Sequence, residues 1–570
     1  MPLAAVLEKV IVRVTDPDKV AKLAGELGVA QPIASILVAR GLDTFNRCKA
    51  FFRPQLELLH DPFLFDDMEK ACERILFAIK EKQRIIVYGD YDVDGVTSTA
   101  LLIRMLRRMG AECDYYLPNR LTEGYGFSQD SVAEIISGAA RLIISVDCGI
   151  SALSEIEQAT AAGIDVIVTD HHEPPEKIPA AYALINPKLP ECAYPDKFLA
   201  GVGVTLKLCQ ALARKSELPD EFWMEYLDLA AIGTAADIVP LIGENRIIAR
   251  FGFEKLLQTS SPGLQALMQL QRLEGMSIST SRVVFQLAPC INAVGRLGDP
   301  RRGVELLLTE DRALARLYAR ELQQANEERK ALDKRVQTET FAWVKQHCHT
   351  EHDFAIVAGS ASWHVGVIGI VASKLVETFF RPTVLFSFDA DGMARGSGRS
   401  IPALNLFEAL KECEDLFESF GGHAAAAGMV MKRENLETFR RRFNNVARER
   451  MAPADLIPIV KADTEVDLRD LSPKFLRILK QMEPFGPGNM RPVLYCRNLA
   501  NRYKPRIVGN GHVKMAVTDG AAVMDAIGFN FGNRFEEVRD AQTFNLAFGL
   551  DENEWMGRKS LQMNIKGIST

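Results

Sequence analysis

The chain lacks any C-x-x-C pair, although it contains ten cysteines. They are scattered over 570 residues. Small disulfide scaffolds have densely spaced cysteines, and thiolate zinc sites have closely paired ones. Neither class fits this spacing. We expect a protein with reduced cysteines that works in the cytoplasm.

Long apolar runs are also missing. No stretch reaches about 18 uninterrupted apolar residues, the length that a membrane-crossing helix needs. The amino-terminal stretch MPLAAVLEKVIVRVTDPDK meets charged residues before an apolar core of signal-peptide length develops. We therefore expect neither export nor a membrane span.

Charge of one sign is not in excess. The 68 Lys and Arg residues and 74 Asp and Glu residues give a formal net charge of −6, and 47% of the residues are hydrophobic. This composition is typical of an ordinary globular protein, and the length predicts several domains. With no global positive field, a polyanionic partner must be held by local basic patches or by metal ions.

Two common catalytic patterns are absent from the sequence. It contains no G-x-S-x-G nucleophile elbow and no Walker A loop. Nothing therefore suggests a covalent serine intermediate or a nucleotide-binding loop of that type.

What is present is a series of short runs rich in Ile and Val, each ending at an acidic residue. They lie at residues 85–88, 142–146 and 165–169, with helical-looking stretches between them. This alternation predicts a parallel α/β sheet. Because the carboxyl ends of parallel strands share one edge, we expect the acidic residues that follow these runs to converge there.

The segment GDYDVDG follows the first run and places Asp90, Asp92 and Asp94 at alternate positions. Alternate side chains of an extended segment point to one side. Carboxylates held so close repel one another unless a cation lies among them. Taken alone, such a motif is more often a solvated acidic turn than a metal site.

Other candidate ligands follow the later runs. SVDCGIS supplies Asp147, TDHHEPP supplies Asp170, His171 and His172, and LDLAAIGTAADIVPL supplies Asp237. A buried structural histidine pair and an aspartate that caps a turn are the alternative interpretations. Oxygen ligands with one or two imidazoles suit Mn²⁺ or Mg²⁺ better than a structural zinc ion. Together these residues predict a site for two such ions.

The rest of the chain divides by texture. Residues 303–348 lack Pro, lack Gly after the first position and carry apolar residues at helical spacing, which predicts one or two long helices joining two domains. A second α/β unit follows, with strand-like FAIVAG and PTVLFSF. Beyond about residue 455, short alternating segments predict a small antiparallel β-barrel of the OB type. The expected segments are 1–50, 51–302, 303–348, 349–455 and 456–570.

Glycine-rich stretches in the second α/β unit predict a phosphate cradle. GSGRSIPALNL and FGGHAAAAGM place Ser397, Arg399 and His423 among glycines, where exposed N–H groups and a guanidinium can hold a phosphate. An ordinary turn is the alternative for either stretch alone. In PNRLTEGYGFS, Arg120 and Tyr125 combine a cation with an aromatic face suited to an unstacked base.

The motifs GDYDVDGVTS, VDCGIS, TDHH and GTAADIVPL, in this order, resemble the DHH phosphoesterase superfamily. With PNRLTEGYGFS, LAGVGVTLKL, INAVGRL, WHVGVIGIVASKL, GSGRS and GGHAAAAG, the chain is similar to the single-strand-specific 5′ exonucleases of that superfamily. The resemblance covers about residues 50–450. It implies an α/β fold: a parallel-sheet DHH domain and a second α/β, DHH-associated domain joined by a long helix. A C-terminal OB-type β-barrel completes the expected architecture.

Two positions depart from the superfamily pattern. Tyr88 stands where some members carry a metal-binding histidine, so a ligand role at that position is in doubt. Cys290 stands where an arginine is expected, so one phosphate contact is either missing or supplied by Arg296.

The resemblance also implies roles for individual residues. The residues implied to bind two Mn²⁺ or Mg²⁺ ions are Asp90, Asp92, Asp94, Asp147, His171 and Asp237. Asp147 would bridge the ions, and His172 would hold the scissile phosphate or orient a ligand rather than bind a metal ion directly. The catalytic set is then Asp92, Asp94, Asp147, His171 and His172. The residues expected to bind the substrate are Arg120, Tyr125, Asn292, Arg296, Ser397, Arg399 and His423.

The implied activity is 5′→3′ exonucleolysis of single-stranded DNA to 5′-mononucleotides, in recombination and repair. The implied partners are single-stranded DNA, a single-strand-binding protein and a helicase, and the chain is expected to be a monomer. Two alternatives stay open. One is a phosphodiesterase for short oligonucleotides with the same metal ions. The other is a non-catalytic replication scaffold, although such a protein would be expected to lose metal ligands.

Overall fold

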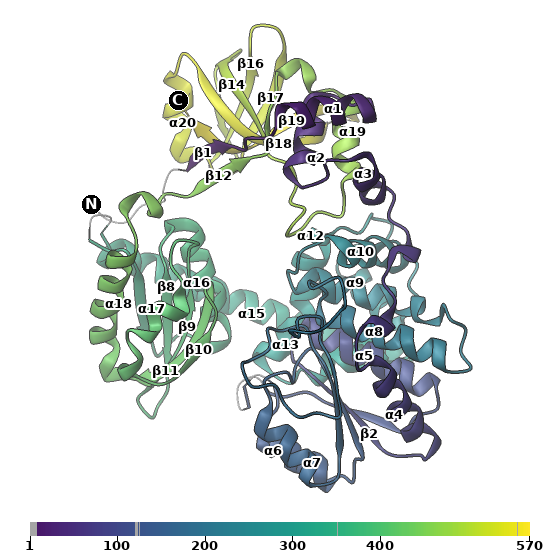
Figure 1. Cartoon of the computed structure of the whole chain (residues 1–570). Coiled ribbons are helices and arrows are strands. Elements are labelled where there is room, and N and C mark those ends of the chain that lie inside the picture. Colours follow the sequence, from purple (N-terminus) through teal and green to yellow (C-terminus); the bar gives the residue numbers. More distant parts are fainter. Residues whose placement is uncertain (1–7, 120–122, 125, 350–351, 556, 570) are drawn as a thin grey trace. The chain divides into compact units, whose positions relative to one another are not determined.

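The computed structural model describes residues 8–119, 123–124, 126–349, 352–555 and 557–569 (Figure 1). The chain forms two compact units. The first comprises residues 49–327 and 482–491, and the second comprises residues 1–48, 328–481 and 492–570.

The first unit is built on a five-stranded parallel sheet. The strand order is β3 (Cys113–Tyr116), β2 (Ile85–Gly89), β4 (Leu142–Val146), β5 (Asp165–Thr169) and β6 (Ala183–Ile185). The three strands predicted from the Ile- and Val-rich runs are confirmed. The sequence analysis missed β3 and β6, which are short and carry weaker apolar patterns.

Helices cover both faces of this sheet, which explains why β2 and β4 are buried along their whole length. Side chains of β2 alternate between two cores. Ile85 and Val87 pack with α4 (Met68–Lys80), α5 (Val93–Arg108) and α8 (Gly201–Lys215). Ile86 and Tyr88 pack with α6 (Gln129–Ser137) and α7 (Leu153–Ala161).

The strand register brings three aspartates to one edge of the sheet. Gly89 pairs with Val146, and Val146 pairs with Thr169. The residues that follow these three are all aspartates, so they leave the sheet side by side. After β2 the chain forms β3 on one side of it and then crosses to form β4 on the other side. In parallel sheets, ligands bind at the point where the strand order reverses in this way.

Helices complete the first unit and lead to the second. They are α9 (Leu227–Ala236), α10 (Gly243–Leu256), α11 (Pro262–Leu270), α12 (Thr280–Arg282), a π-helical turn (Val283–Leu287), α13 (Ala288–Leu297) and α14 (Arg301–Leu308). The long α15 (Arg312–His347) contributes to both units. The helical stretch predicted at 303–348 is two helices, α14 and α15, because the chain breaks between Leu308 and Arg312. The Asp311 carboxylate caps the start of α15 by accepting the Ala313 N–H at 2.6 Å.

The second unit contains a mixed five-stranded sheet. Its order is β10 (Phe417–Gly422), β11 (Ala426–Lys432), β9 (Met393–Arg399), β8 (Thr383–Phe388) and β7 (Ile356–Ser360). The helices of this part are α16 (Val365–Phe379), α17 (Leu406–Lys411) and α18 (Leu436–Arg450). The strands predicted in FAIVAG and PTVLFSF are β7 and β8.

The same unit contains a small barrel. Its strands are β14 (Leu494–Asn501), β16 (His512–Thr518), β17 (Val523–Gly528), β18 (Phe544–Trp555) and β19 (Arg558–Ser569). Pairing of β14 with β16 closes these strands into a ring. The pair β17–β19 is parallel, unlike the antiparallel barrel predicted, because the β18–β19 hairpin returns the chain beside β17 in the same direction.

The amino-terminal segment belongs to the second unit and packs on the barrel. Strand β1 (Lys9–Val12) pairs in parallel with β12 (Ile459–Ala462). The buried guanidinium of Arg534 contacts the carboxylates of Glu8 and Glu537 and donates to the Ile568 carbonyl at 2.9 Å. Helices α1 (Pro17–Leu27), α2 (Gln31–Ala39) and α3 (Phe45–Phe52) then lead toward the first unit.

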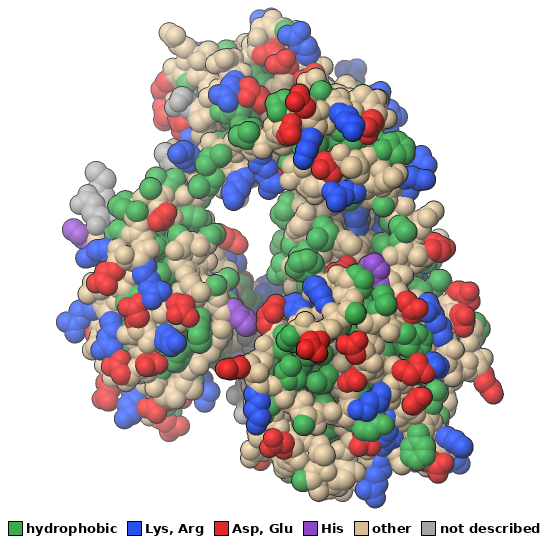
Figure 2. All heavy atoms as spheres, in the orientation of Figure 1, with side chains coloured by type: hydrophobic (Ala, Val, Ile, Leu, Met, Phe, Trp, Pro, Cys, Tyr) green, Lys and Arg blue, Asp and Glu red, His purple; other side chains and the backbone are tan. Residues whose placement is uncertain are grey.

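Within the described residues, no single helix has the length and apolarity of a membrane span. The sharply bent pair α1 and α2 meets that test only when the two are taken together. Acidic and basic side chains are interspersed on the face shown in Figure 2, in keeping with the small net charge.

Candidate metal centre and phosphate-binding motifs

The loop after β2 is held in a tight turn by its own side chains. Asp92 caps α5, and its Oδ1 accepts the N–H groups of Asp94 at 2.8 Å and Gly95 at 3.1 Å. A Cβ atom on Gly95 would lie 2.4 Å from the carbonyl oxygen of Asp90. Only glycine fits there, and this close turn brings the Asp90 and Asp92 carboxylates together.

Asp94 lies in the first turn of α5 and is buried. Its two carboxylate oxygens accept the N–H groups of Gly201 at 2.7 Å and Val202 at 2.8 Å. These N–H groups belong to the first turn of α8, where negative charge is stabilised. The motif LAGVGVTLKL therefore positions Asp94, a role that the sequence analysis did not assign to it.

Asp147 follows β4 in a left-handed backbone conformation, with φ +61°. Aspartate tolerates this region better than most residues. Its carboxylate lies against the start of α8, and a Cβ atom on Gly201 would be 2.4 Å from its Oδ1. Glycine at this position leaves room for the carboxylate.

Asp170 organises the histidine loop after β5. Its Oδ1 accepts the N–H groups of His171 at 2.7 Å and His172 at 3.1 Å and lies 2.7 Å from Nδ1 of His172. Its Oδ2 accepts the Ile150 N–H at 3.0 Å. Burial acts in the opposite direction, but the His172 hydrogen bond lowers the pKa of Asp170. The sequence predicted that Asp170 would reach this edge, and its structural role depends on these bonds.

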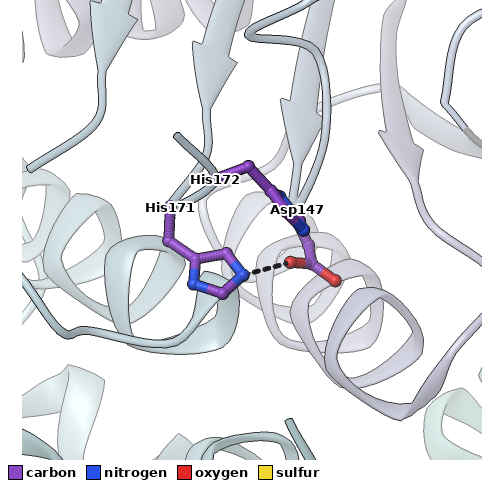
Figure 3. A group of neighbouring side chains, drawn as sticks. All are labelled: Asp147, His171 and His172. Atoms are coloured by element: carbon purple, nitrogen blue, oxygen red, sulfur yellow. Dashed lines mark ion pairs between the residues drawn. The ribbon is translucent and has the colours of Figure 1, made fainter. Parts of the chain in front are cut away.

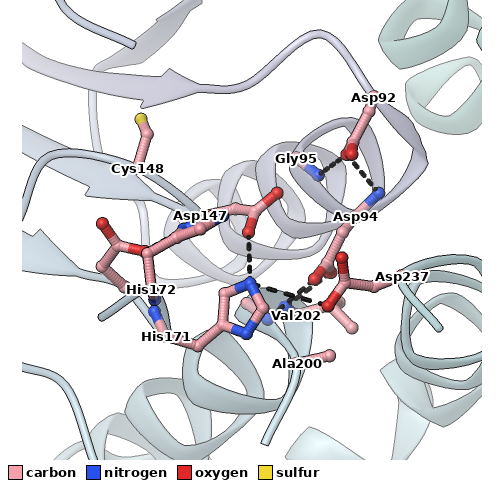
Figure 4. Close-up of polar contacts among 12 residues, drawn as sticks. Asp92, Asp94, Gly95, Asp147, Cys148, His171, His172, Ala200, Val202 and Asp237 are labelled. Atoms are coloured by element: carbon pink, nitrogen blue, oxygen red, sulfur yellow. Dashed lines mark hydrogen bonds and ion pairs between the residues drawn. The ribbon is translucent and has the colours of Figure 1, made fainter. Parts of the chain in front are cut away.

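His171 links the carboxylates that come from different elements. Its Nε2 lies 3.2 Å from Asp147 Oδ1 (Figure 3). The same atom is 3.6 Å from Asp237 Oδ2, at the end of α9 (Figure 4). The two histidine rings lie 4.5 Å apart.

The six residues predicted as ligands fall into two groups, and a third group of Asp147, His171 and His172 links the two. Potential ligand atoms of Asp90, Asp92 and Asp147 lie within 4.8 Å of one another, as do those of Asp94, His171 and Asp237. Carboxylate oxygens with one imidazole form a donor set that suits Mn²⁺ or Mg²⁺. The residues present therefore fit a pair of divalent cations.

The electrostatics of the cluster favour bound positive charge. Burial and the neighbouring Asp92 raise the pKa of Asp94 to about 7. Burial and the Asp94 charge raise the pKa of Asp237 to about 9, and the same causes raise that of Asp147. Burial, with His172 nearby, lowers the pKa of His171 to about 3, so its imidazole is neutral, the form that can coordinate a metal ion. Such carboxyls are ionised together only when cations offset their repulsion.

Two predicted substrate-binding residues lie on α13. Asn292 and Arg296 are four residues apart and therefore share one side of this helix. A Cβ atom on Gly295 would be 2.8 Å from the carbonyl oxygen of Tyr91, so α13 packs directly on the loop of clustered aspartates. Arg120 and Tyr125 lie outside the described residues.

The predicted phosphate cradle is brought together by strand pairing in the second unit. Arg399, at the end of β9, pairs with Ala426, and the N–H of His423 bonds to the Ala426 carbonyl at 2.8 Å. The Arg399 guanidinium donates to Ser397 Oγ at 3.1 Å. A Cβ atom on Gly369 of α16 would be 2.9 Å from that hydroxyl oxygen, so the helix lies close to it.

Both departures from the superfamily pattern are explained by burial. The Tyr88 hydroxyl donates to the Gly126 carbonyl at 2.9 Å, and the Tyr88 ring stacks on Phe127 with centroids 4.0 Å apart. Tyr88 therefore holds Gly126 and Phe127 in place, and its hydroxyl is engaged in the core of this side of the sheet. The Cys290 sulfur is buried and accepts from the side-chain amides of Gln271 at 3.3 Å and Asn326 at 3.4 Å. A phosphate cannot reach it there.

Family models match three segments of the chain. The DHH family, N-terminal domain matches residues 84–234, the DHHA1 domain matches residues 352–449, and the RecJ OB domain matches residues 462–567. The first contains every residue of the three groups of potential ligands except Asp237, which lies just beyond its end.

Similar proteins match over nearly the whole chain. The single-stranded-DNA-specific exonuclease RecJ of Bacillus subtilis is 40% identical over 97% of this chain and 69% of its own length. The crystal structure of Thermus thermophilus RecJ with Mn²⁺ has a TM-score of 0.85 and 29% identity, covering 99% of this chain and 79% of that one. Its structure with Mg²⁺ has a TM-score of 0.77 and 27% identity, covering 99% and 78%.

The raised pKa values of the buried carboxyls predict how pH affects the stability of the metal-free protein, prepared with a chelator. Protonated Asp94 and Asp237 are favoured in the fold. Their contribution to the free energy of unfolding is full below the ordinary value of 3.8 and is lost as pH rises through about 7 and about 9. We expect the Tm of the metal-free protein to fall as pH rises over this range. Added Mn²⁺ should reverse most of the fall. Differential scanning fluorimetry with chelator or Mn²⁺ measures both effects.

The matched control is Asp237→Asn, which removes one buried carboxyl. It should flatten the fall in Tm without Mn²⁺. An equal pH slope with and without Mn²⁺ would contradict this account of the cluster.

Proposed function

The chain belongs to the RecJ family of DHH phosphoesterases, and from that premise we propose that it is a metal-dependent, single-stranded-DNA-specific exonuclease. In this proposal it degrades strands from the 5′ end and releases 5′-mononucleotides during recombination and repair. The observation that carries the proposal is the meeting of five aspartates and His171 at the carboxyl edge of the parallel sheet.

The ligand residues act by holding two Mn²⁺ or Mg²⁺ ions. Asp90, Asp92 and Asp147 would hold one ion, and Asp94, His171 and Asp237 would hold the other. Asp147, whose Oδ1 lies 3.2 Å from His171 Nε2, would contribute to both. When bound, the two ions neutralise the carboxylates, activate a water molecule and stabilise charge developing on the phosphate. The N–H groups of Gly201 and Val202 keep Asp94 oriented.

His172 is proposed to contact the scissile phosphate. Its side chain is 38% exposed, whereas that of His171 is 8% exposed. Burial opposes protonation, but the bond to Asp170 raises the pKa of His172 and favours its cationic form. The Asp170 bond to Nδ1 fixes the orientation of the ring, and a cationic imidazole attracts a phosphate oxygen.

Arg399, Ser397 and His423 are proposed to hold the 5′-terminal phosphate, while Arg120, Tyr125, Asn292 and Arg296 contact the adjoining strand. A guanidinium and a hydroxyl 3.1 Å apart can bind one phosphate from two sides. We further propose that the protein works in the cytoplasm as a monomer. A single-strand-binding protein and a helicase would supply its substrate.

The activity is tested with a 5′-phosphorylated single strand labelled at its 3′ end. We expect a descending ladder that requires Mn²⁺ or Mg²⁺, and no cleavage of the matching blunt duplex. Gel electrophoresis over time with each metal ion or chelator measures direction, strandedness and metal dependence. Cleavage confined to very short oligonucleotides would replace the proposed substrate with the short-substrate alternative.

The bridging role of Asp147 is tested with Asp147→Asn. Asparagine tolerates the left-handed backbone at this position, so the variant should fold while losing the bridging charge. We expect turnover to fall by at least about a thousandfold, since both ions lose a ligand. Binding of single-stranded DNA should change little. Turnover near that of the wild type would remove Asp147 from the metal centre.

Replacing Arg399 with Ala tests the 5′-phosphate cradle. The variant should bind 5′-phosphorylated strands about tenfold more weakly, because a charge-assisted hydrogen-bond partner is lost. Strands with a 5′-hydroxyl should bind equally well to variant and wild type. Fluorescence anisotropy measures both, and Arg441→Ala, at an exposed position on α18, is the control. Equal losses for the two kinds of strand end would place the terminal phosphate elsewhere.

A further inference from the structure

The first unit contains an apolar groove that the metal centre does not use. It has a volume of about 530 Å³ and is formed by the end of α9, by α10, by the segment from Ser277 through the π-helical turn, and by residues 483–491. All of these residues belong to the first unit.

Four large apolar side chains that line this groove are exposed, among them Leu257 at 44%. Phe285 is 74% exposed, Ile238 is 67% exposed and Met490 is 65% exposed. Single exposed apolar residues are ordinary, but several in one concave site indicate a binding surface. A phenylalanine ring with this exposure offers a free face for stacking.

The backbone around the groove has unusual conformations that present these side chains. Phe285 lies on a π-helical turn, a rare element that is frequent at functional sites. Ile238 has φ +65°, which is disfavoured for a β-branched residue. Such strain persists only where the surrounding structure holds it, and it is concentrated at functional sites.

The wall formed by residues 483–491 is held firmly in place. The buried Arg246 guanidinium donates to the carbonyl oxygens of Met482 at 2.9 Å and Glu483 at 2.9 Å, and it lies 3.8 Å from the centre of the Phe51 ring. The Leu241 N–H also bonds to the Pro487 carbonyl at 2.7 Å. The groove is therefore a preformed surface within its unit.

The charges of the groove are balanced, so it is not a phosphate site. Its basic residues are Arg250 and Arg491, and its acidic residues are Glu254 and Glu483. Arg250 is paired with Glu254 at 2.9 Å. A ligand bound here must be held mainly through apolar and stacking contacts, which weaken little with salt.

We propose that this groove binds nucleobases of the part of the single strand that has not yet been cleaved, with Phe285 as a stacking platform. The inference rests on the proposed function and adds a base-binding subsite to it. Ile238 directly follows Asp237, so the groove begins one residue from the metal centre. An uncleaved strand leaving the centre past Asp237 reaches Ile238 first. Bases of any sequence can stack on an aromatic face, as an exonuclease requires.

The test compares normal strands with strands that lack bases. In an Asp147→Asn background, which prevents cleavage, Phe285→Ala should weaken binding of a long single strand by about tenfold. It should leave binding of a dinucleotide unchanged, and it should leave binding of an otherwise identical abasic strand unchanged. Fluorescence anisotropy at several salt concentrations should give the same salt slope for both proteins.

Phe77→Ala is the matched control, because Phe77 is a 51% exposed phenylalanine on α4 of the same unit and does not line the groove. An equal loss of affinity for normal and abasic strands, or no loss for either, would overturn the base-binding inference. If the wild-type protein gives no single-strand ladder, the proposed function fails first. A normal ladder with unaltered binding by Phe285→Ala rejects the groove alone.

Discussion

Repulsion among buried carboxylates is the constraint on which the first unit depends. Strand register sends the residues after β2, β4 and β5 to one point, and α9 adds Asp237. Burial and mutual charge raise the pKa values of Asp94, Asp147 and Asp237 together. The fold tolerates this arrangement because backbone N–H groups of α8 and a neutral His171 surround it, and because divalent cations can complete it.

The supporting residues hold this cluster without sharing its chemistry. Gly95 and Gly201 leave space that a Cβ atom would fill. Asp170 binds the histidine loop through three hydrogen bonds and Ile150, in the loop after β4, through a fourth. Tyr88 anchors the neighbouring loop through its ring and hydroxyl group. The geometry of the centre therefore depends on residues that are not themselves predicted metal ligands.

Much of this could be predicted from sequence because the informative patterns are local. Three strands follow from apolar runs, and the convergence of their terminal aspartates follows from parallel pairing. The roles of Gly201 and Asp170 depend on contacts between distant segments, which periodicity does not reveal. The parallel β17–β19 pair and the packing of the amino-terminal segment on the barrel were missed for the same reason. The groove around Phe285 had no sequence signal, because π-helical turns and left-handed isoleucines have no simple motif.

Residues 482–491, which include the wall of the groove, return the chain to the first unit and so prevent one cut in the chain from separating the two units. The chain passes from one unit to the other after residues 48, 327, 481 and 491. No single cut therefore yields two complete pieces, and a fragment ending before residue 482 would lack part of the first unit. A protease that cuts any one of these junctions leaves at least one unit built from two fragments. Shortened versions of this enzyme must be designed around that interleaving.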